Sequence, residues 1–348
     1  MFSAINTFST ADTISFFENL GVPLKTERGN RVFPVSDKAH DIVMALKNYA
    51  LENGAKIVHE NVVSIIPSNS DERKIAKVKT EKGEYAFDEV ILCTGGKSYP
   101  TTGSDGFGYE IAKALGHTVI QPIPSLIGLI SQDTCCKDMQ GLTLKNIGVE
   151  FEDTKKRKSI YKDFGELLFT HFGVSGPLIL SASAHMRHFD KKQYRLEIDL
   201  KPALDEQMLD KRLLSDFEKH ANGDYCNVLG ALLPQKMIDE FIDRSGIPPH
   251  EKVHDITRAQ RETIRTLLKR WTVNVSAPMP VENAIITSGG VKVGEIDPKT
   301  MASKKIGGLY FAGEIIDVDA YTGGYNLQIA WATGKAAGEA AADALLTQ

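Results

Sequence analysis

The sequence predicts an α/β protein whose α/β domain is discontinuous, because a long insert interrupts it. Two apolar runs point to this fold class: Val90–Cys93 leads straight into glycines, and Leu309–Phe311 does the same near the other end of the chain. Such continuous runs are typical of strands buried on both faces of a parallel sheet. The stretch between them changes texture, first to strand-like segments and then to charged helical ones. We therefore expect four segments: 1–120 as the first part of the α/β domain, 121–201 as a β-rich insert, 202–278 as a small helical insert, and 279–348 as the second part of the α/β domain.

The first segment alternates helices and strands. Helices are expected at Thr10–Leu20, ended by Gly21, and at Ser36–Asn53, ended by Gly54. Short strand patterns follow at Lys56–Val58, Val62–Ile66, Ile75–Thr80 and Glu84–Phe87. The last two are separated by a Lys-Gly turn and predict a hairpin.

The later segments have their own patterns. Strand-like stretches in the β-rich insert are Leu126–Ile130, Ile147–Phe151, Glu166–Thr170 and Arg195–Leu200. Pro202–Trp271 is charged with helical spacing, and a final helix is expected at Leu327–Leu346. Gly334 and Gly338 lie one turn apart in that helix, where each costs about 1 kcal/mol relative to alanine. They therefore predict close packing against a neighbouring backbone.

The composition is that of an ordinary soluble protein. The 348 residues are 42% hydrophobic and 25% charged, with a net charge of −4, so no overall field attracts nucleic acid or anionic lipid. The basic run Lys155–Lys158 predicts a solvated loop or strand end, with nucleic-acid binding as the minor alternative. Neither a secretion signal nor an apolar run of about 20 residues is visible, and the four cysteines show no metal-binding spacing. We expect a cytoplasmic protein with a small-molecule substrate, no metal, and neither nucleic acid nor membrane as a partner; its oligomeric state stays open.

One glycine-rich segment runs from Leu309 to Gln328 and reads LYFAGEIIDVDAYTGGYNLQ. Gly313 and the pair Gly323-Gly324 remove side chains where a flat or phosphorylated ligand would meet the backbone. A helix that begins near Asn326 would present free N–H groups, which suit an anion or the pyrimidine end of a reduced flavin. Acceptors for sugar or ribityl hydroxyls are offered by Glu314, Asp317 and Asp319. A plain turn with solvated carboxylates is an equal alternative.

A second such segment, Cys93 to Gly108, reads CTGGKSYPTTGSDGFG. Its hydroxyl donors are Thr94, Ser98, Thr101, Thr102 and Ser104, and Tyr99 could pack on a ring. Asp105 is as well suited to capping the next helix as to binding a ligand. A G-x-G-x-x-G dinucleotide turn is absent, since Gly106 and Gly108 are followed by Ile111 at the third position.

The ordered set CTGG-x-SYP-x-TGS-x-G-x-GY, PSL, LLFTHFGVSGP, TSGGV and GLYFAGEIIDVDAYTGGYNLQIAWATG resembles a family of FAD-dependent flavoproteins described as aminoacetone oxidases or bile-acid-dehydroxylation reductases. The resemblance covers nearly the whole chain. It implies a Rossmann-like FAD domain of the two-dinucleotide-binding-domain type, interrupted by a β-barrel-like and a helical insert. It also implies an FAD-dependent oxidoreductase that transfers hydride through the flavin to or from a small organic substrate, with NAD(P)H as a candidate electron donor.

The resemblance also implies a set of cofactor residues. The loop at Thr94 and Gly95 would lie near the pyrophosphate or adenosine half of FAD, and the loop at Thr102 and Gly103 near the flavin and substrate. Gly313 and Glu314 would lie by the ribityl and pyrophosphate groups, and the start of the last helix under the pyrimidine. The set is Thr94, Gly95, Gly96, Thr102, Gly103, Gly313, Glu314, Asp317, Gly324, Tyr325, Asn326 and Leu327. No catalytic acid or base stands out; His171 and Tyr99 are the candidates, and a structural role for His171 is the stronger expectation. Ser175 is set aside because Pro177 breaks the nucleophile-elbow pattern.

The chain departs from the family pattern at its beginning. Members of the family open with a strand and a glycine-rich dinucleotide turn before the point that corresponds to Met1. We therefore expect a truncated member, with FAD affinity in question. The alternative to an active oxidoreductase is a non-catalytic chain that does not retain FAD.

Overall fold

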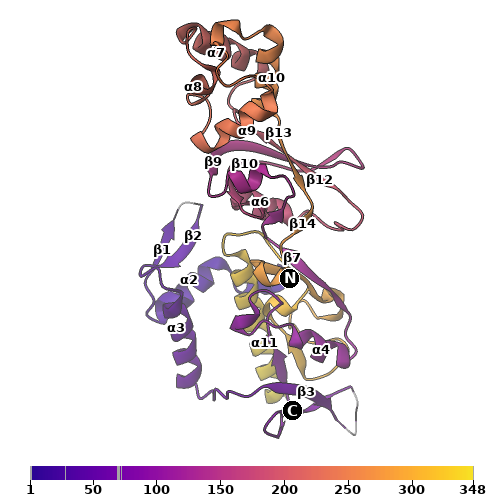
Figure 1. Ribbon diagram of the computed structural model, residues 1–348. Helices are drawn as coiled ribbons and strands as arrows, with labels where there is room; N and C mark the ends of the chain where they lie inside the picture. Colours follow the sequence, from indigo (N-terminus) through magenta and orange to yellow (C-terminus); the bar gives the residue numbers. More distant parts are fainter. Residues whose placement is uncertain (1, 28, 69–70, 72, 348) are drawn as a thin grey trace. The chain divides into compact units, whose positions relative to one another are not determined.

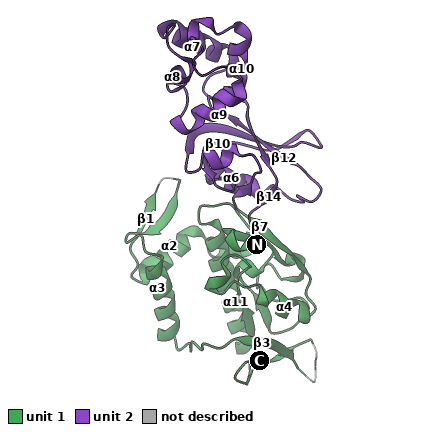
Figure 2. Ribbon diagram, viewed as in Figure 1, with its two compact units in different colours: residues 1–125, 281–348 green, residues 126–280 purple. Residues whose placement is uncertain are grey.

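The computed structural model describes residues 2–27, 29–68, 71 and 73–347 (Figure 1). The chain divides into two compact units, each considered by itself below (Figure 2). Unit 1 combines Met1–Ser125 with Val281–Gln348, and unit 2 is Leu126–Pro280. The mixed α/β class is confirmed. The further division of the insert at residue 201 stays a prediction.

The described helices of unit 1 come from both of its parts, and the first two contact the last one. They are α1 (Phe2–Thr7), α2 (Thr10–Asn19), α3 (Ala39–Glu52), α4 (Phe107–Ala114) and α11 (Tyr325–Leu346). α2 begins where the sequence predicts because Ser9 forms a capping box: Asp12 N–H donates to Ser9 Oγ at 3.3 Å, and Ser9 N–H donates to Asp12 Oδ2 at 2.8 Å. The α3 helix begins three residues later than predicted, because Ser36 lies in a turn where its hydroxyl accepts from Lys38 N–H at 3.2 Å.

The strands of unit 1 form small sheets. They are β1 (Leu24–Glu27), β2 (Arg31–Pro34), β3 (Val62–Pro67), β4 (Ile75–Thr80), β5 (Glu84–Ala86), β6 (Val90–Leu92), β7 (Val119–Ser125), β15 (Ile286–Val291) and β16 (Leu309–Phe311). β4 and β5 pair as the predicted hairpin. The strand expected at Lys56–Val58 is not formed: Ile57 and Val58 are exposed, and no described strand pairs with them.

β6 and β16 are parallel neighbours, with Leu92 opposite Phe311. Helix α11 packs against them through its small residues, and Ala332, Ala337 and Phe311 are fully or almost fully buried (Figure 1). The expectation for the two glycines of this helix was wrong. A Cβ added at Gly334 or Gly338 would meet nothing within 4 Å, so the alanine face, not the glycines, makes the close contact.

Unit 2 is built on a sheet in the order β13-β12-β9-β10-β11-β8-β14. The strands are β8 (Leu129–Ile130), β9 (Thr143–Asp153), β10 (Lys158–Thr170), β11 (Gly173–Ser175), β12 (Tyr194–Asp199), β13 (Trp271–Val275) and β14 (Ala277–Pro278). The two strands at the ends of this order are separated in the chain by Ser276 alone. The barrel-like closure implied by the resemblance stays a prediction.

The helices of unit 2 cover one large core. They are α5 (Cys135–Asp138), α6 (Pro177–Ser183), α7 (Glu206–Lys219), α8 (Tyr225–Leu229), α9 (Gln235–Ser245) and α10 (Arg258–Lys269). Phe151, Phe169 and Trp271 are fully buried in that core. The Arg244 guanidinium lies 4.1 Å from the centre of the Trp271 ring, and Arg244 also pairs with Glu240 at 2.7 Å. In the described part of the chain, no helix is long and apolar enough to cross a membrane.

Candidate functional site

The two glycine-rich segments meet at one edge of unit 1. β6 and β16 run in the same direction, so the residues that follow them, Thr94 and Gly95 after β6 and Gly313 after β16, lie side by side. The carboxyl ends of parallel strands are where α/β sheets bind ligands. Segments more than 200 residues apart in the sequence are thereby brought to one place.

Glu314 ties these segments together. Its Oε1 accepts from Ser98 Oγ at 3.1 Å and from Thr287 N–H at 2.8 Å. Thr287 Oγ1 in turn accepts from Lys97 N–H at 2.8 Å and from Ser98 N–H at 3.2 Å. One carboxylate oxygen of a predicted cofactor residue is therefore already bonded to protein groups. Ser98, expected as a ligand donor, is buried and has the same structural role.

Gly96 is required by this arrangement. A Cβ at Gly96 would lie 2.7 Å from Glu314 Oε1 and equally close to Thr287 Cβ, and closer still to Thr287 Oγ1. Similarly, a Cβ at Gly108 would overlap Thr94 Oγ1, so the start of α4 packs directly on that threonine. These two glycines serve close packing between loops.

Three of the other four glycines of the predicted set lie more openly. Gly95, Gly103, Gly313 and Gly324 all have positive φ, between 72° and 107°, and the last three have no atom closer than 3.7 Å to an added Cβ. The backbone at these three glycines therefore faces space that a ligand can enter, whereas a Cβ at Gly95 would lie 2.6 Å from Ser104 Oγ. Some of their backbone groups are already bonded: Gly313 N–H donates to Thr333 Oγ1 at 2.9 Å, and Gly103 N–H donates to Pro100 O at 3.0 Å.

The loop before α11 is held by side chains. Asn326 Oδ1 accepts from Ala320 N–H at 2.8 Å, and Asn326 Nδ2 donates to Ala320 O at 2.9 Å. Asp319 accepts from Ser125 Oγ and Ser288 Oγ, both at 2.8 Å. The aspartate is therefore a structural acceptor and not a solvated loop charge. The sequence offered no signal for Ser125 or Ser288 as partners.

The start of α11 faces solvent. Its N-cap is Gly324, which provides no side-chain cap, and Tyr325 and Leu327 are 61% and 56% exposed. An uncapped N-terminus of a 22-residue helix presents free N–H groups and the positive end of the helix dipole. This end of the helix can therefore stabilise negative charge on a ligand.

Tyr99 has an unusual backbone. Its φ is 53°, a left-handed conformation that is rare for a large residue, and its ring is half exposed. The conformation is held because Tyr99 N–H donates to Glu282 O at 3.1 Å and Thr102 Oγ1 donates to Tyr99 O at 2.7 Å. The hydroxyl of Thr102 thus supports the turn that presents the Tyr99 ring to solvent.

The other candidate catalytic residue, His171, does not lie in unit 1. His171 belongs to unit 2, is exposed, and packs edge-on against Phe172 with ring centres 5.2 Å apart. Unit 1 has a buried titratable group beside Glu314. It is Tyr109, whose hydroxyl lies 3.5 Å from Glu314 O. Burial raises its pKa, and the carboxylates of Glu314 and Asp317 raise it further, so its hydroxyl stays protonated.

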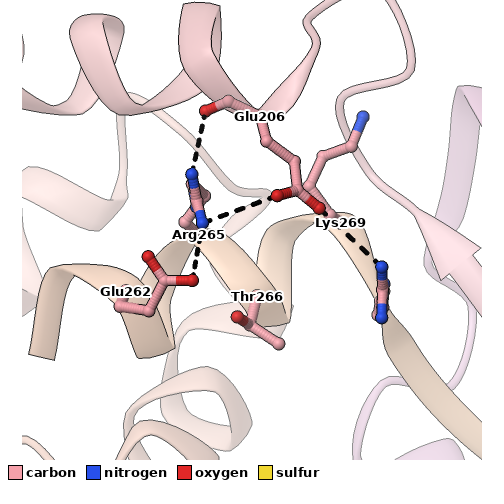
Figure 3. Close-up of a pocket in the computed structure, with 6 residues that line it drawn as sticks. Glu206, Glu262, Arg265, Thr266 and Lys269 are labelled. Atoms are coloured by element: carbon pink, nitrogen blue, oxygen red, sulfur yellow. Dashed lines mark hydrogen bonds and ion pairs between the residues drawn. The ribbon is translucent and has the colours of Figure 1, made fainter. Parts of the chain in front are cut away.

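A small pocket in unit 2 offers no alternative site for a cofactor. Arg265 Nη2 lies 2.6 Å from Glu262 Oε1 and 3.5 Å from Glu206 Oε2, and Arg270 approaches Glu206 at 3.8 Å (Figure 3). The charges around the hollow are paired with one another. It contains none of the predicted cofactor residues.

Comparison with known proteins agrees with the fold. A family model described as the HI0933-like protein Rossmann domain matches residues 1–340. The 3-dehydro-bile acid delta(4,6)-reductase of Clostridium scindens is 29% identical over 348 residues, covering 98% of this chain and 82% of the relative. The ribosomal RNA dihydrouridine synthase of Haemophilus influenzae is 30% identical over 336 residues, covering 96% and 80%, and that of Escherichia coli is 30% identical over 251 residues, covering 72% and 59%.

The sequence motifs, the parallel strand pair and the relatives all indicate the same family. The predicted resemblance is confirmed. The chain belongs to the HI0933-like Rossmann family, a flavoprotein-type family of oxidoreductases.

Proposed function

We propose that this protein is an FAD-dependent oxidoreductase that passes hydride through the flavin to a carbon–carbon double bond conjugated with a carbonyl group. The observation that carries the proposal is the meeting of both glycine-rich segments and the bare start of α11 in unit 1. These are the parts that an extended, phosphorylated, flat cofactor requires.

The residues present fit FAD. The open glycines Gly103, Gly313 and Gly324 leave backbone accessible where a side chain would block a ring or a pyrophosphate. The half-exposed ring of Tyr99 offers a flat apolar surface. The free N–H groups at Tyr325 and Asn326 would hold negative charge on the pyrimidine edge, as the resemblance implies.

FAD, when bound, supplies a two-electron acceptor and donor. The residues of the chain bind and orient it. Glu314 and Thr287 keep the strand-end loops in register, and Asn326 holds the loop against the helix start. Tyr99 stays the candidate acid or base of unit 1, and orientation of the cofactor is the main contribution that we propose for the chain.

The substrate class follows from the names of the relatives. A bile-acid delta(4,6) double bond beside a 3-oxo group and the double bond lost when uridine becomes dihydrouridine are both alkenes polarised by a carbonyl. Hydride would add to the far carbon of such a bond because the negative charge moves to the carbonyl oxygen. A proton from solvent water or from the candidate acid Tyr99 would then complete the reduction at the near carbon. NAD(P)H is the proposed electron donor, and reduction is proposed over oxidation.

The test is the visible absorption spectrum of the purified protein, before and after incubation with excess FAD and desalting. We expect retained flavin bands that bleach under anaerobic NADPH and recover when an enone substrate is added. A protein that stays colourless after incubation would overturn FAD binding and favour the non-catalytic alternative. Bands that bleach but do not recover with any enone or uridine compound would overturn the substrate class and leave FAD binding intact.

A further inference from the structure

A cluster of lysines lies at one end of the unit 2 sheet, where two loops meet. Taken alone, Lys155–Lys158 predicts a solvated loop, but the structure places a second basic loop against it. Thr154 N–H donates to Gln193 O at 2.9 Å, and Lys155 Nζ donates to Lys191 O at 2.8 Å. We name as the basic tip the side chains Lys155, Lys156, Lys158, Lys191 and Lys192.

The geometry of the strands fixes this meeting. β9 pairs with both β10 and β12, and Asp153 is opposite Lys158 on one side and Tyr194 on the other. The hairpin turn between β9 and β10 and the loop that leads into β12 must therefore emerge together. Asp153 is buried and accepts from Lys155 N–H at 3.2 Å and Lys156 N–H at 3.3 Å, so the turn is shaped from within.

The basic tip is not neutralised. Among the residues that the structure describes, none of its five ammonium groups forms an ion pair, and Asp190 is the one exposed carboxylate in the two loops. The nearest acids on the strands are occupied: Glu150 pairs with Lys162, and Glu152 and Glu197 pair with Arg195. We leave Arg157 out of the basic tip because it lines a hollow with these same glutamates.

This cluster is at odds with the charge of the whole chain, which is −4. Unpaired lysines held close together repel one another, so such a cluster is stabilised when it meets an anion. Lysine binds phosphate as a flexible point charge and does not require one fixed geometry. The arrangement therefore suits a repeating row of phosphates better than a single small ligand.

We infer that the basic tip binds the phosphodiester backbone of double-helical nucleic acid. Single strands are bound mainly through exposed Phe, Tyr and Trp rings, and the described loops present none of these: Phe189 is half-buried against Tyr194, with ring centres 4.8 Å apart. Insertion into a membrane needs exposed large apolar side chains, and neither loop has one. Contacts to phosphate give affinity without base specificity.

Binding is tested by fluorescence anisotropy with a labelled RNA duplex, using the full chain without added FAD. A matched DNA duplex, anionic phosphatidylserine vesicles and poly-glutamate serve as competitors. With four to five phosphate contacts, we expect affinity to fall roughly 150- to 500-fold between about 50 and 200 mM salt. The test does not depend on flavin, so its failure leaves the proposed function untouched.

The decisive variant is the triple change Lys156→Gln, Lys158→Gln and Lys191→Gln, which removes charge from both loops. We expect it to weaken duplex binding about tenfold or more at about 100 mM salt and to reduce the salt dependence by about two to three counterions. The matched control is Lys47→Gln, Lys56→Gln and Lys79→Gln, three exposed lysines of unit 1, which should change affinity less than about twofold.

Equal losses in the two triple variants would overturn the inference, because binding would then follow net charge alone. Displacement of the duplex by vesicles or by poly-glutamate at the same charge concentration would also overturn it. Competition by the DNA duplex as strong as by RNA would support a backbone-only contact, and stronger competition by RNA would support recognition of the A-form helix.

Discussion

Thr287 N–H donates a 2.8 Å hydrogen bond to Glu314 Oε1, and through this bond the strand β15 is fastened to the loop that follows β16. Thr287 is buried, and its hydroxyl accepts from the backbone of the loop after β6. Three chain segments thus share one threonine. The shape of the proposed flavin surface depends on contacts beneath it as much as on the residues that face the ligand.

Gly96→Ala tests this packing. The added methyl group would clash with Glu314 and Thr287, so we expect a loss of about 1–3 kcal/mol in the free energy of unfolding. FAD retention should fall in the same variant. Urea unfolding measures the first effect, with Gly83→Ala as the control, since an added Cβ there meets nothing within 4 Å. Equal stability of Gly96→Ala and wild type would show that the loops can move apart at little cost.

Asn326→Ala removes both hydrogen bonds between the helix start and Ala320. We expect a stability loss of about 1 kcal/mol and FAD binding weaker by about tenfold, because the loop would no longer be held against α11. Asn326→Asp keeps the acceptor and loses the donor, so its stability and its FAD affinity should lie between those of wild type and Asn326→Ala. Isothermal titration with FAD measures the series. Tighter binding in Asn326→Ala than in wild type would contradict the positioning role.

The stability of unit 1 should depend on pH through Glu295. Burial opposes its ionisation, but Thr118 N–H at 2.8 Å and Lys305 Nζ at 2.9 Å hold the pKa of Glu295 at about 2, below the ordinary 4.5. A carboxyl whose pKa is lower in the folded state stabilises the fold above the unfolded pKa. That contribution is lost as the pH falls from 4.5 toward 2.

Glu295→Gln should therefore be less stable than wild type at pH 7, by about 1–3 kcal/mol, and the gap should narrow as the pH falls below about 4.5. Urea unfolding at several pH values gives the comparison. Glu110→Gln is the control, because the Glu110–Lys113 pair is exposed and worth little. A gap that stays constant down to pH 3 would mean that the charge of Glu295 is unimportant.

Gly334→Ala should stabilise the protein. The site is inside α11, its surroundings are open, and alanine has the higher helix propensity, so we expect a gain of about 0.5–1 kcal/mol. Gly338→Ala should behave alike, and the two gains should add. Thermal unfolding is sufficient to measure them. A loss of stability in both would show that this face of the helix packs on something in solution after all.

Local signals in the sequence predicted several elements because the forces that form them are local. α2 has its capping box, and the β4–β5 hairpin has its turn. β7 was not predicted, since Pro122 and Pro124 break the strand pattern. They are tolerated because, among the described strands, β7 pairs with β15 alone. The glycine-rich segments of the site were identified, but their partners were not.

Thr287, Ser125 and Ser288 show why. Each lies on a strand and bonds a carboxylate that is 27 to 194 residues away in the chain. Hydroxyl residues on strands are common, and nothing in their local pattern names the distant acceptor. The glycine pair of the TSGGV motif was the one sequence feature that could have indicated these contacts. A Cβ at Gly289 would lie 2.5 Å from Gln121 O, and one at Gly290 would lie 2.5 Å from Ile315 O, so the pair marks where β15 touches two backbones.

Ser125, the last residue of unit 1 before unit 2 begins, is the register partner of Ile286, which lies five residues after the chain re-enters unit 1 at Val281. A linker of a few residues could therefore join the two strands directly. In evolution, an insertion point between two paired strands allows a whole domain to be gained, exchanged or lost without disrupting the sheet that receives it.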